Sequence, residues 1–214
     1  MANKKIRIGV VGASGYTGSD LVRLAARHPY IEMAAMTANS HAGKKMIDVF
    51  PHFYMLDLPD LVTWEDVDWS TIDAVFCGLP HGTTQDVTST IMAANGAIKV
   101  IDMSADFRLR NKDTYAKWYG LTHWAGDLLS SAVYGLSEHY RSAIQSARLI
   151  ACPGCYPTAT LMALLPPVAA GLIEVDDLII DAKSGTTGAG RSAKQNTLLA
   201  EAGEGLSPYG IASH

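Results

Sequence analysis

Apolar residues gather along this chain in short blocks that predict strands and helices in alternation. Residues 6–11 form an apolar run of strand length, and residues 31–36 form another. Residues 17–28 between them have helical periodicity, and Pro29 ends that helix. Three apolar side chains are predicted to share one helix face: Leu21, Leu24 and Ala25. Residues 6–36 therefore predict a βαβ unit with a right-handed crossover.

The alternation continues beyond this unit. Residues 74–77 and 99–102 predict two further strands, separated by a helix over about 86–95 that ends at Gly96 as a C-cap. Residues 107–130 are rich in Trp, Tyr and charged side chains and predict a loop or short helices. The pattern as a whole predicts an α/β fold with a doubly wound parallel sheet.

The last part of the chain has weaker periodicity. Residues 148–151 predict a strand, and residues 157–170 predict a helix that is ended by Gly171. Residues 178–182 predict another strand. Residues 202–214 show no period, so no regular structure is predicted there.

Composition narrows the class of protein. The 214 residues are 48% hydrophobic and 18% charged, which suits one large domain or one and a fraction. The net charge of -4 provides no general positive field, so nucleic acid and anionic membranes are not expected partners. No apolar stretch reaches about 18 residues and no apolar signal region opens the chain, so a cytoplasmic protein is expected.

The chain has three cysteines: Cys77, Cys152 and Cys155. Three cysteines cannot build a disulfide framework, and no second ligand pair accompanies them for a structural zinc ion. No metal site is therefore expected. Any importance of these residues lies in thiol chemistry.

A glycine-rich turn joins the first predicted strand to the first helix. It reads Gly-Ala-Ser-Gly-Tyr-Thr-Gly over residues 12–18. In such a turn the first glycine permits a tight bend, the second lets the backbone approach a pyrophosphate, and the third allows close helix packing. The spacing differs from G-x-G-x-x-G, so a glycine-rich turn without ligand remains an alternative. The residues predicted to bind the cofactor here are Gly12, Ser14, Gly15, Tyr16, Thr17 and Gly18.

The end of the second predicted strand favours NADP over NAD. An NAD site usually has an acidic residue there for the ribose 2′-hydroxyl. This chain instead has Thr37 and Ser40, followed by Lys44 and Lys45, which could reach a 2′-phosphate. The alternative is that the two lysines are ordinary solvated side chains.

A second turn, Cys-Pro-Gly-Cys-Tyr-Pro over residues 152–157, lies between a predicted strand and a predicted helix. Unpaired N–H groups and the helix dipole favour a thiolate there, so Cys155 is a candidate nucleophile. Such a thiolate can expel phosphate from an acyl phosphate, giving a thioester that nicotinamide hydride reduces to an aldehyde. Two alternatives remain open: a buried structural cysteine, and a C-x-x-C redox pair of Cys152 and Cys155.

Five segments together resemble the N-acetyl-γ-glutamyl-phosphate reductase family of arginine biosynthesis, and the resemblance spans the chain. The Gly-Cys-Tyr-Pro-Thr turn is its most specific part. The resemblance implies NADP(H)-dependent reduction of an acyl phosphate to a semialdehyde, with Cys155 as nucleophile. The five segments are residues 12–18, 104–108, 134–138, 153–158 and 184–191.

The resemblance also implies two domains and further roles. Residues 1–150 would be a Rossmann-type dinucleotide-binding domain, and residues 151–214 the beginning of an α+β substrate and dimerisation domain, so a homo-oligomer is expected. A histidine of a His-Arg-His-x-Pro-Glu motif would transfer protons. The chain ends at Ser213-His214, so His214 matches the first histidine and the rest of that motif and domain is absent.

Roles carried over from the family fall into two groups. Arg108 would bind a substrate carboxylate or phosphate, with Gly154 and Tyr156 beside it, although a surface salt bridge is the alternative for Arg108. Three residues would line the cofactor cleft: Cys77, Pro80 and His81. Ser184 would also bind the cofactor, and the backbone would approach nicotinamide and substrate at Gly188, Ala189 and Gly190. An ordinary loop histidine is the alternative for His81. Two other functions stay open: an NADP-binding fragment without turnover, and a lysine-pathway aminoadipyl-phosphate reductase.

Overall fold

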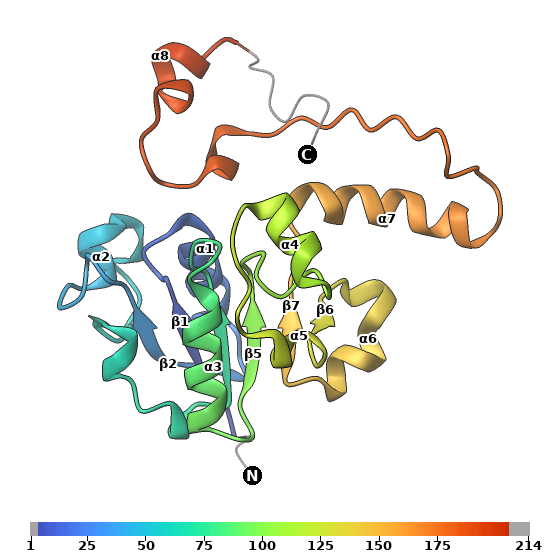
Figure 1. Ribbon diagram of the computed structural model, residues 1–214. Coiled ribbons are helices and arrows are strands. Elements are labelled where there is room, and N and C mark those ends of the chain that lie inside the picture. Colours follow the sequence, from blue (N-terminus) through green and yellow to red (C-terminus); the bar gives the residue numbers. More distant parts are fainter. Residues whose placement is uncertain (1–3, 206–214) are drawn as a thin grey trace. The chain divides into compact units, whose positions relative to one another are not determined.

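The computed structural model describes residues 4–205. They form two compact units, divided between Thr158 and Ala159, and each unit is described by itself. The first unit contains a sheet with helices around it (Figure 1).

The first unit is built on a seven-stranded parallel sheet. Its strand order, β3-β2-β1-β4-β5-β7-β6, places the first strand near the middle and winds outward in both directions. The predicted doubly wound α/β fold is therefore confirmed. The strands are β1 (Ile6–Val11), β2 (Ile31–Thr37), β3 (Leu61–Val62), β4 (Ala74–Cys77), β5 (Lys99–Asp102), β6 (Val133–Tyr134) and β7 (Leu149–Ala151).

The helices of the described residues vary from single turns to fifteen residues. The α-helices are α1 (Tyr16–Ala25), α2 (Met46–Val49), α3 (Thr84–Ala94), α4 (Lys112–Tyr119), α5 (Gly126–Leu129), α6 (Ser137–Ser146), α7 (Cys155–Ala169) and α8 (Leu199–Ala202). The 3₁₀ turns are η1 (Pro51–Phe53), η2 (Trp64–Asp66), η3 (Trp69–Thr71), η4 (Thr186–Ala189) and η5 (Gln195–Thr197). The region of residues 107–130 does contain short helices, as expected.

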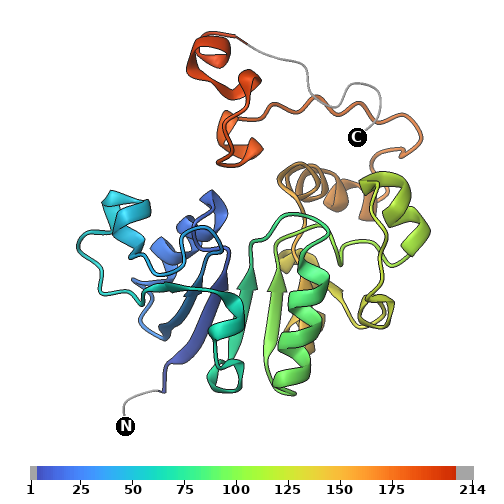
Figure 2. The same cartoon turned by 60° about the vertical axis from the view of Figure 1, so that its left-hand side comes forward.

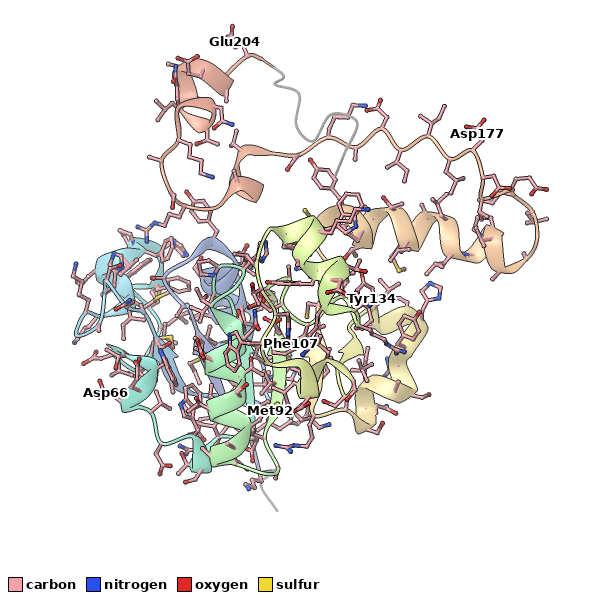
Figure 3. The ribbon with its side chains drawn as sticks, in the orientation of Figure 1. Asp66, Met92, Phe107, Tyr134, Asp177 and Glu204 are labelled. Carbon is pink, nitrogen blue, oxygen red and sulfur yellow. The ribbon has the colours of Figure 1, made fainter. Side chains whose placement is uncertain are left out.

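Two hydrophobic cores lie on opposite faces of the sheet. Val10 packs in a cluster with Val22 of α1, whereas its neighbour Val11 packs in a second cluster with Val87 and Ile91 of α3. Successive residues of a strand point to opposite faces, so α1 and α3 cover different faces. Helix α3 runs along the sheet in both views of the ribbon (Figure 2). Phe107, labelled in Figure 3, belongs to the α3 side of the core.

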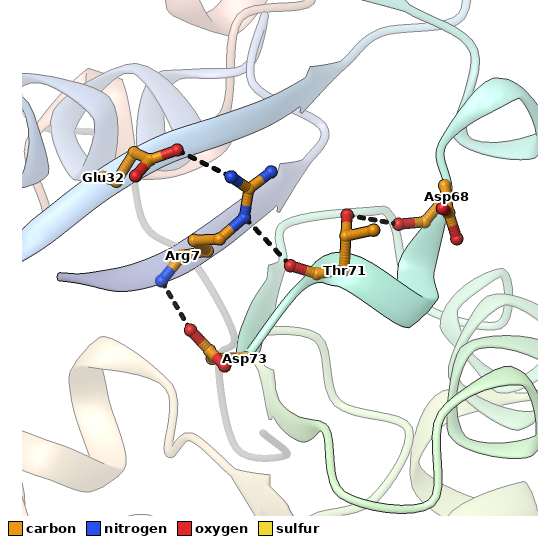
Figure 4. Close-up of polar contacts among 5 residues, drawn as sticks. All are labelled: Arg7, Glu32, Asp68, Thr71 and Asp73. Atoms are coloured by element: carbon orange, nitrogen blue, oxygen red, sulfur yellow. Dashed lines mark hydrogen bonds and ion pairs between the residues drawn. The ribbon is translucent and has the colours of Figure 1, made fainter. Parts of the chain in front are cut away.

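Arg7 ties three segments together at the start of β1 (Figure 4). Its amide N–H donates to the Asp73 carboxylate at 2.8 Å, and its Nε donates to the Thr71 carbonyl oxygen at 3.0 Å. Its Nη1 forms an ion pair with Glu32 of β2 at 2.9 Å. These contacts fix the amino-terminal edge of the sheet.

Two local predictions about helices are wrong. Leu24 was expected on the buried face of α1, but it is 61% exposed, and the buried residues are Gly18, Ser19, Val22 and Ala25. Close packing of two small residues rotates the helix away from the side that Leu24 occupies. Helix α3 ends at Asn95, not with a glycine C-cap, because the Asn95 side chain donates to the carbonyl oxygens of Trp69 and Ile72 at 3.1 Å.

The second unit, residues 159–205, contains most of α7, then η4, η5 and α8. The strand expected at residues 178–182 is not formed, since the described residues of this unit contain no strand. A strand needs a neighbour to satisfy its backbone groups, and none of these residues supplies one. Ile179 is accordingly 92% exposed. Asp177, labelled in Figure 3, lies in this extended segment.

The predicted helix over 157–170 is confirmed, but it begins earlier, at Cys155, and the chain leaves it through Gly171 with φ of +67°. Of residues 202–214, for which no regular structure was predicted, residues 206–214 lie outside the described part. Ala202 is the last residue of α8, and residues 203–205 belong to no helix or strand. Among the described helices, none is long and apolar enough to span a membrane.

Candidate active site

The carboxyl ends of five adjacent strands lead into every predicted site segment of the first unit. Strands β1, β2, β4, β5 and β7 are parallel, so the residues that follow them meet at one edge of the sheet. This edge is where doubly wound sheets bind ligands, because the strand order reverses there. The two turns singled out in the sequence, residues 12–18 and 152–157, both lie at this edge.

The glycine-rich turn is fixed by its backbone. Gly12 has φ of +82°, and the amides of Gly12 and Ala13 donate to the Thr37 carbonyl oxygen at 3.1 and 2.9 Å. A Cβ on Gly18 would lie 2.3 Å from the Gly12 oxygen and 2.8 Å from the Ala13 Cα. Both glycines are thus required by the fold of the turn itself.

Gly15 is different, because the fold does not require it. A Cβ there would meet only the Gly12 oxygen, at an ordinary 3.5 Å. Gly15 is the N-cap of α1, no side chain caps the helix, and the first turn contains no acidic residue. The missing side chain keeps an uncapped helix N-terminus open to an anion. A pyrophosphate fits this turn, as a dinucleotide cofactor requires.

The end of β2 is without acidic residues from Thr37 to Ile47. Thr37 is only 2% exposed, so its side chain does not line an open surface, and its carbonyl oxygen is what holds the glycine turn. Ser40 and Lys44 are exposed. The loop is tied to β3, since Gly43 N–H donates to the Leu61 carbonyl oxygen and Leu61 N–H donates to that of Lys44. These residues present hydroxyl and ammonium groups at the position where NAD enzymes place a carboxylate.

Arg108 binds the cysteine turn directly. Its Nε donates to the Cys152 carbonyl oxygen at 2.7 Å, and its Nη2 donates to that of Met103 at 3.0 Å. Nη1 lies close to Gly154, where a Cβ would stand 3.2 Å away. The surface salt bridge considered for Arg108 is not what it forms. Two of its three guanidinium nitrogens donate to backbone carbonyl oxygens, which leaves Nη1 as the nitrogen available to a substrate.

Two further contacts fix the same turn. Cys152 N–H donates to the Asp102 carbonyl oxygen at 2.7 Å. Gly135, after β6, donates to the Ala151 carbonyl oxygen at 2.8 Å, and a Cβ there would lie 3.1 Å from the Cys152 Cα. Strands β5 and β6 therefore hold the turn from both sides.

Cys155 lies in the first turn of α7 and is exposed. The first intrahelical bond runs from Thr158 N–H to the Gly154 carbonyl oxygen at 2.9 Å, and the Thr158 hydroxyl donates to the same oxygen. The Cys155 sulfur thus belongs to the positive end of the helix, as the sequence predicted. Tyr156 beside it is half-buried.

The other two cysteines are held as thiols. Burial and the nearby Asp102 carboxylate raise the pKa of Cys152 to about 11. Cys77 at the end of β4 is completely buried, and burial with the same carboxylate raises its pKa further still. Burial also raises the pKa of Asp102 to about 6. A C-x-x-C redox pair needs two reactive sulfurs, and Cys152 does not provide one.

Asp106 organises the loop that follows β4. Its carboxylate is fully buried and accepts hydrogen bonds from Gly82 N–H at 2.7 Å, Thr84 N–H at 3.1 Å and the Tyr115 hydroxyl at 2.7 Å. Pro80 in this loop is exposed. Asp106 lies in one of the segments on which the family resemblance rests, but the sequence predicts no role for it. The available signal was an acidic residue between the apolar Ala105 and Phe107.

The remaining predicted site residues lie elsewhere. Ser184, Gly188 and Gly190 belong to the second unit, where Gly190 has φ of +85° and a Cβ on Gly188 would lie 2.8 Å from Ser184 Oγ. Ala189 closes η4. His214 lies outside the described residues.

Comparison with known protein families identifies the family to which the chain belongs. Residues 7–147 match the semialdehyde dehydrogenase NAD binding domain, and residues 155–214 match the semialdehyde dehydrogenase dimerisation domain. The chain belongs to the semialdehyde dehydrogenase family. Residues 148–154, which include the start of the cysteine turn, lie between the two matched segments.

Two curated relatives show where in the family the chain lies. It is 53% identical to the N-acetyl-gamma-glutamyl-phosphate reductase of Afipia carboxidovorans, over 100% of this chain and 61% of the relative. It is 52% identical to a probable chloroplastic enzyme of the same name from Arabidopsis thaliana, over 99% of this chain and 52% of the relative. The chain thus spans between about half and three-fifths of the length of these relatives.

Solved structures agree on the fold. Aspartate semialdehyde dehydrogenase II of Vibrio cholerae superposes with a TM-score of 0.57 at 17% identity, over 78% of this chain and 47% of that chain. The aspartate semialdehyde dehydrogenase of Candida albicans superposes with a TM-score of 0.52 at 20% identity, over 78% of this chain and 48% of that chain. At such identities the likeness concerns the fold alone.

Proposed function

We propose that this chain carries the cofactor turn and the nucleophile of an NADPH-dependent N-acetyl-γ-glutamyl-phosphate reductase. The observation that carries the proposal is the exposed Cys155 in the first turn of α7, at the same sheet edge as the glycine turn. The curated relatives named above support this activity over that of other semialdehyde dehydrogenases.

Cys155 would act as the nucleophile on the acyl phosphate. Its thiolate would form a C–S bond to the acyl carbon, while the C–O bond to phosphate breaks and phosphate leaves with the electron pair. When bound, NADPH supplies the hydride that takes the resulting thioester to the aldehyde level. Departure of the aldehyde would return the electron pair to the Cys155 sulfur. Arg108 would hold the turn in place and offer Nη1 to an anionic oxygen of the substrate.

NADPH would be held by residues of two strand ends. The pyrophosphate would lie against Gly15 and the N-terminus of α1, and the 2′-phosphate near Ser40 and Lys44. We propose that NADPH binds more tightly than NADH for this reason. Calorimetry of the 214-residue chain with each dinucleotide measures the preference, and Lys44→Ala should reduce it. Equal binding of both dinucleotides would contradict the NADP assignment.

The activity itself is tested by thiol substitution. In a protein that contains this chain, phosphate- and NADP-dependent oxidation of N-acetylglutamate semialdehyde should be lost in Cys155→Ser. Cys152→Ser is the matched control and should keep most of the activity, since the Cys152 sulfur is not reactive. Activity that survives in Cys155→Ser would contradict the mechanism. Faster turnover of the aminoadipate homologue would assign the lysine-pathway substrate, and NADPH binding without turnover would favour a binding module.

A further inference from the structure

His81 has one ring nitrogen committed to the backbone. Ala105 N–H donates to its Nδ1 at 3.0 Å. A peptide N–H only donates, so Nδ1 must accept and has no hydrogen. The neutral ring therefore has its hydrogen on Nε2, and protonation of Nδ1 would cost the bond to Ala105.

The ring is also fixed in orientation. It contacts the Tyr119 ring edge to face, with centroids 5.6 Å apart. The next residue, Gly82, has φ of +86° and donates its N–H to Asp106 at 2.7 Å. A bonded neighbour on one side and an aromatic contact on the other leave His81 little freedom, although the residue is exposed.

His81 lies within electrostatic reach of Arg108. Partial burial and the Arg108 charge lower the pKa of His81, while Asp106 opposes them. Among residues 4–205, neither Nε2 of His81 nor Nη1 of Arg108 has a hydrogen-bond partner. Both nitrogens are therefore donors without an acceptor among the described residues. They lie on neighbouring loops that follow β4 and β5 at the carboxyl edge of the sheet. A group that accepts from both, next to a guanidinium charge, is an anion.

We propose that His81 binds an anionic oxygen of the substrate phosphate through Nε2–H, as a neutral donor of fixed tautomer. The inference rests on the proposed function, because phosphate is the group that Cys155 displaces. A neutral ring whose free nitrogen bears hydrogen cannot accept a proton there. His81 is therefore excluded as the general base, and proton transfer falls to another group.

Two substitutions separate the two ring nitrogens. In His81→Asn the amide oxygen can occupy the position of Nδ1 and keep the Ala105 bond, but the Nε2 donor is lost. In His81→Gln the longer side chain places its amide near the position of Nε2, but the Ala105 bond is weakened. A residue with a merely structural role would tolerate Asn better than Gln, whereas the proposal requires the opposite for phosphate binding.

The experiment uses the uniformly ¹⁵N-labelled 214-residue chain and a titration with inorganic phosphate. NMR of wild type should show hydrogen on Nε2 of His81 and none on Nδ1, and phosphate should shift the Nε2 signal. Following the Gly154 amide, the phosphate Kd should rise about tenfold in His81→Asn and change less than about twofold in His81→Gln. Thermal unfolding of each variant checks that it folds.

Several outcomes would overturn the proposal: hydrogen on Nδ1, no phosphate binding in wild type, or unchanged phosphate binding in His81→Asn. A parallel titration with NADPH separates the sources of phosphate, since both variants should bind NADPH as wild type does. A loss of NADPH binding in His81→Asn would assign the donor to the cofactor and overturn the proposal. Failure of wild type to bind NADPH would instead contradict the proposed function. The phosphate titration would still test the role of His81, because it does not depend on NADPH.

Discussion

The two strand-to-helix turns at the sheet edge are alike in topology and different in construction. The turn after β1 is shaped by missing side chains, with Gly18 packed against backbone within the turn and Gly12 packed against the backbone of Gly78 after β4. The turn after β7 is shaped by contacts from far along the chain, above all from Arg108. The first turn is held by backbone contacts with the ends of β2 and β4, whereas the second also needs a side chain, that of Arg108.

The comparison explains why neighbouring cysteines differ. Cys152 lies on the inner side of its turn, where strand β5 brings the Asp102 carboxylate close, and Cys155 lies on the helix side and is exposed. The two cysteines are only three residues apart in the sequence. Tertiary contacts, and not the local pattern, select which sulfur is available.

Thiol reactivity tests this difference and has the largest expected effect. At pH 8, a pKa of about 11 leaves roughly one Cys152 in a thousand as thiolate. Iodoacetamide should therefore modify Cys155 at least about a hundredfold faster than Cys152 or Cys77. Mass spectrometry of the tryptic peptides measures each rate. Comparable rates for Cys152 and Cys155 would restore the redox-pair hypothesis.

The glycine turn is tested by a matched pair of alanine substitutions. Gly18→Ala should cost about 3 kcal/mol of unfolding free energy, because its Cβ meets rigid backbone. Gly15→Ala should change stability by less than about 0.5 kcal/mol, since its Cβ has room. Urea unfolding measures both. Gly15→Ala should nevertheless weaken NADPH binding, and unchanged binding there would show that the turn does not hold a pyrophosphate.

The buried Asp102 carboxyl makes the stability of the first unit sensitive to pH. Its pKa is raised from 3.8 to about 6. Between these two pH values the folded chain keeps a proton on Asp102 that the unfolded chain loses. Stability from this group is greatest below pH 3.8 and falls by about 2 to 3 kcal/mol as pH rises to 6. Asp102→Asn should flatten this part of the curve, measured by urea unfolding from pH 4 to 7. The exposed Asp60→Asn is the control and should leave the curve unchanged.

Arg108 provides a smaller expected loss of stability than Gly18 or Asp102. Arg108→Ala removes the donors to Cys152 and Met103 and should cost about 2 kcal/mol. Arg108→Lys should recover only part of this, because one ammonium cannot reproduce the planar fork. Exposed Arg110→Ala is the control. If Arg108→Ala leaves both the unfolding curve and the Cys152 modification rate unchanged, the hydrogen bonds of Arg108 do not stabilise the cysteine turn.

Much of the fold could be predicted because strands of a buried parallel sheet are apolar runs bounded by turns. The bounds of β1, β4 and β5 agree with those runs. The two-residue strands β3 and β6 were missed, since such a short segment has no periodicity. The strand expected at residues 178–182 is wrong for a related reason, because its apolar residues need a partner strand that the described residues lack.

In the candidate site, too, some features could be predicted from the sequence and others depend on tertiary contacts. Its residue types and turns were visible in sequence, including the glycines of the first turn and Cys155. The buried state of Cys77, the three bonds to Asp106 and the tautomer of His81 were not. Each of these depends on which groups face one another across different strands, and a linear pattern does not contain that information.

The sequence by itself determined the order of the longer strands and helices of the first unit, the glycine turn and the position of a cysteine at a helix start. These follow from hydrophobic periodicity and backbone conformation, which act between neighbours in the chain. Only the tertiary structure decided which cysteine is exposed and what Arg108 binds. Arg108 and Cys152 are 44 residues apart, and folding of the sheet brings them within 2.7 Å. Burial and hydrogen bonding over such separations set the chemistry of the site.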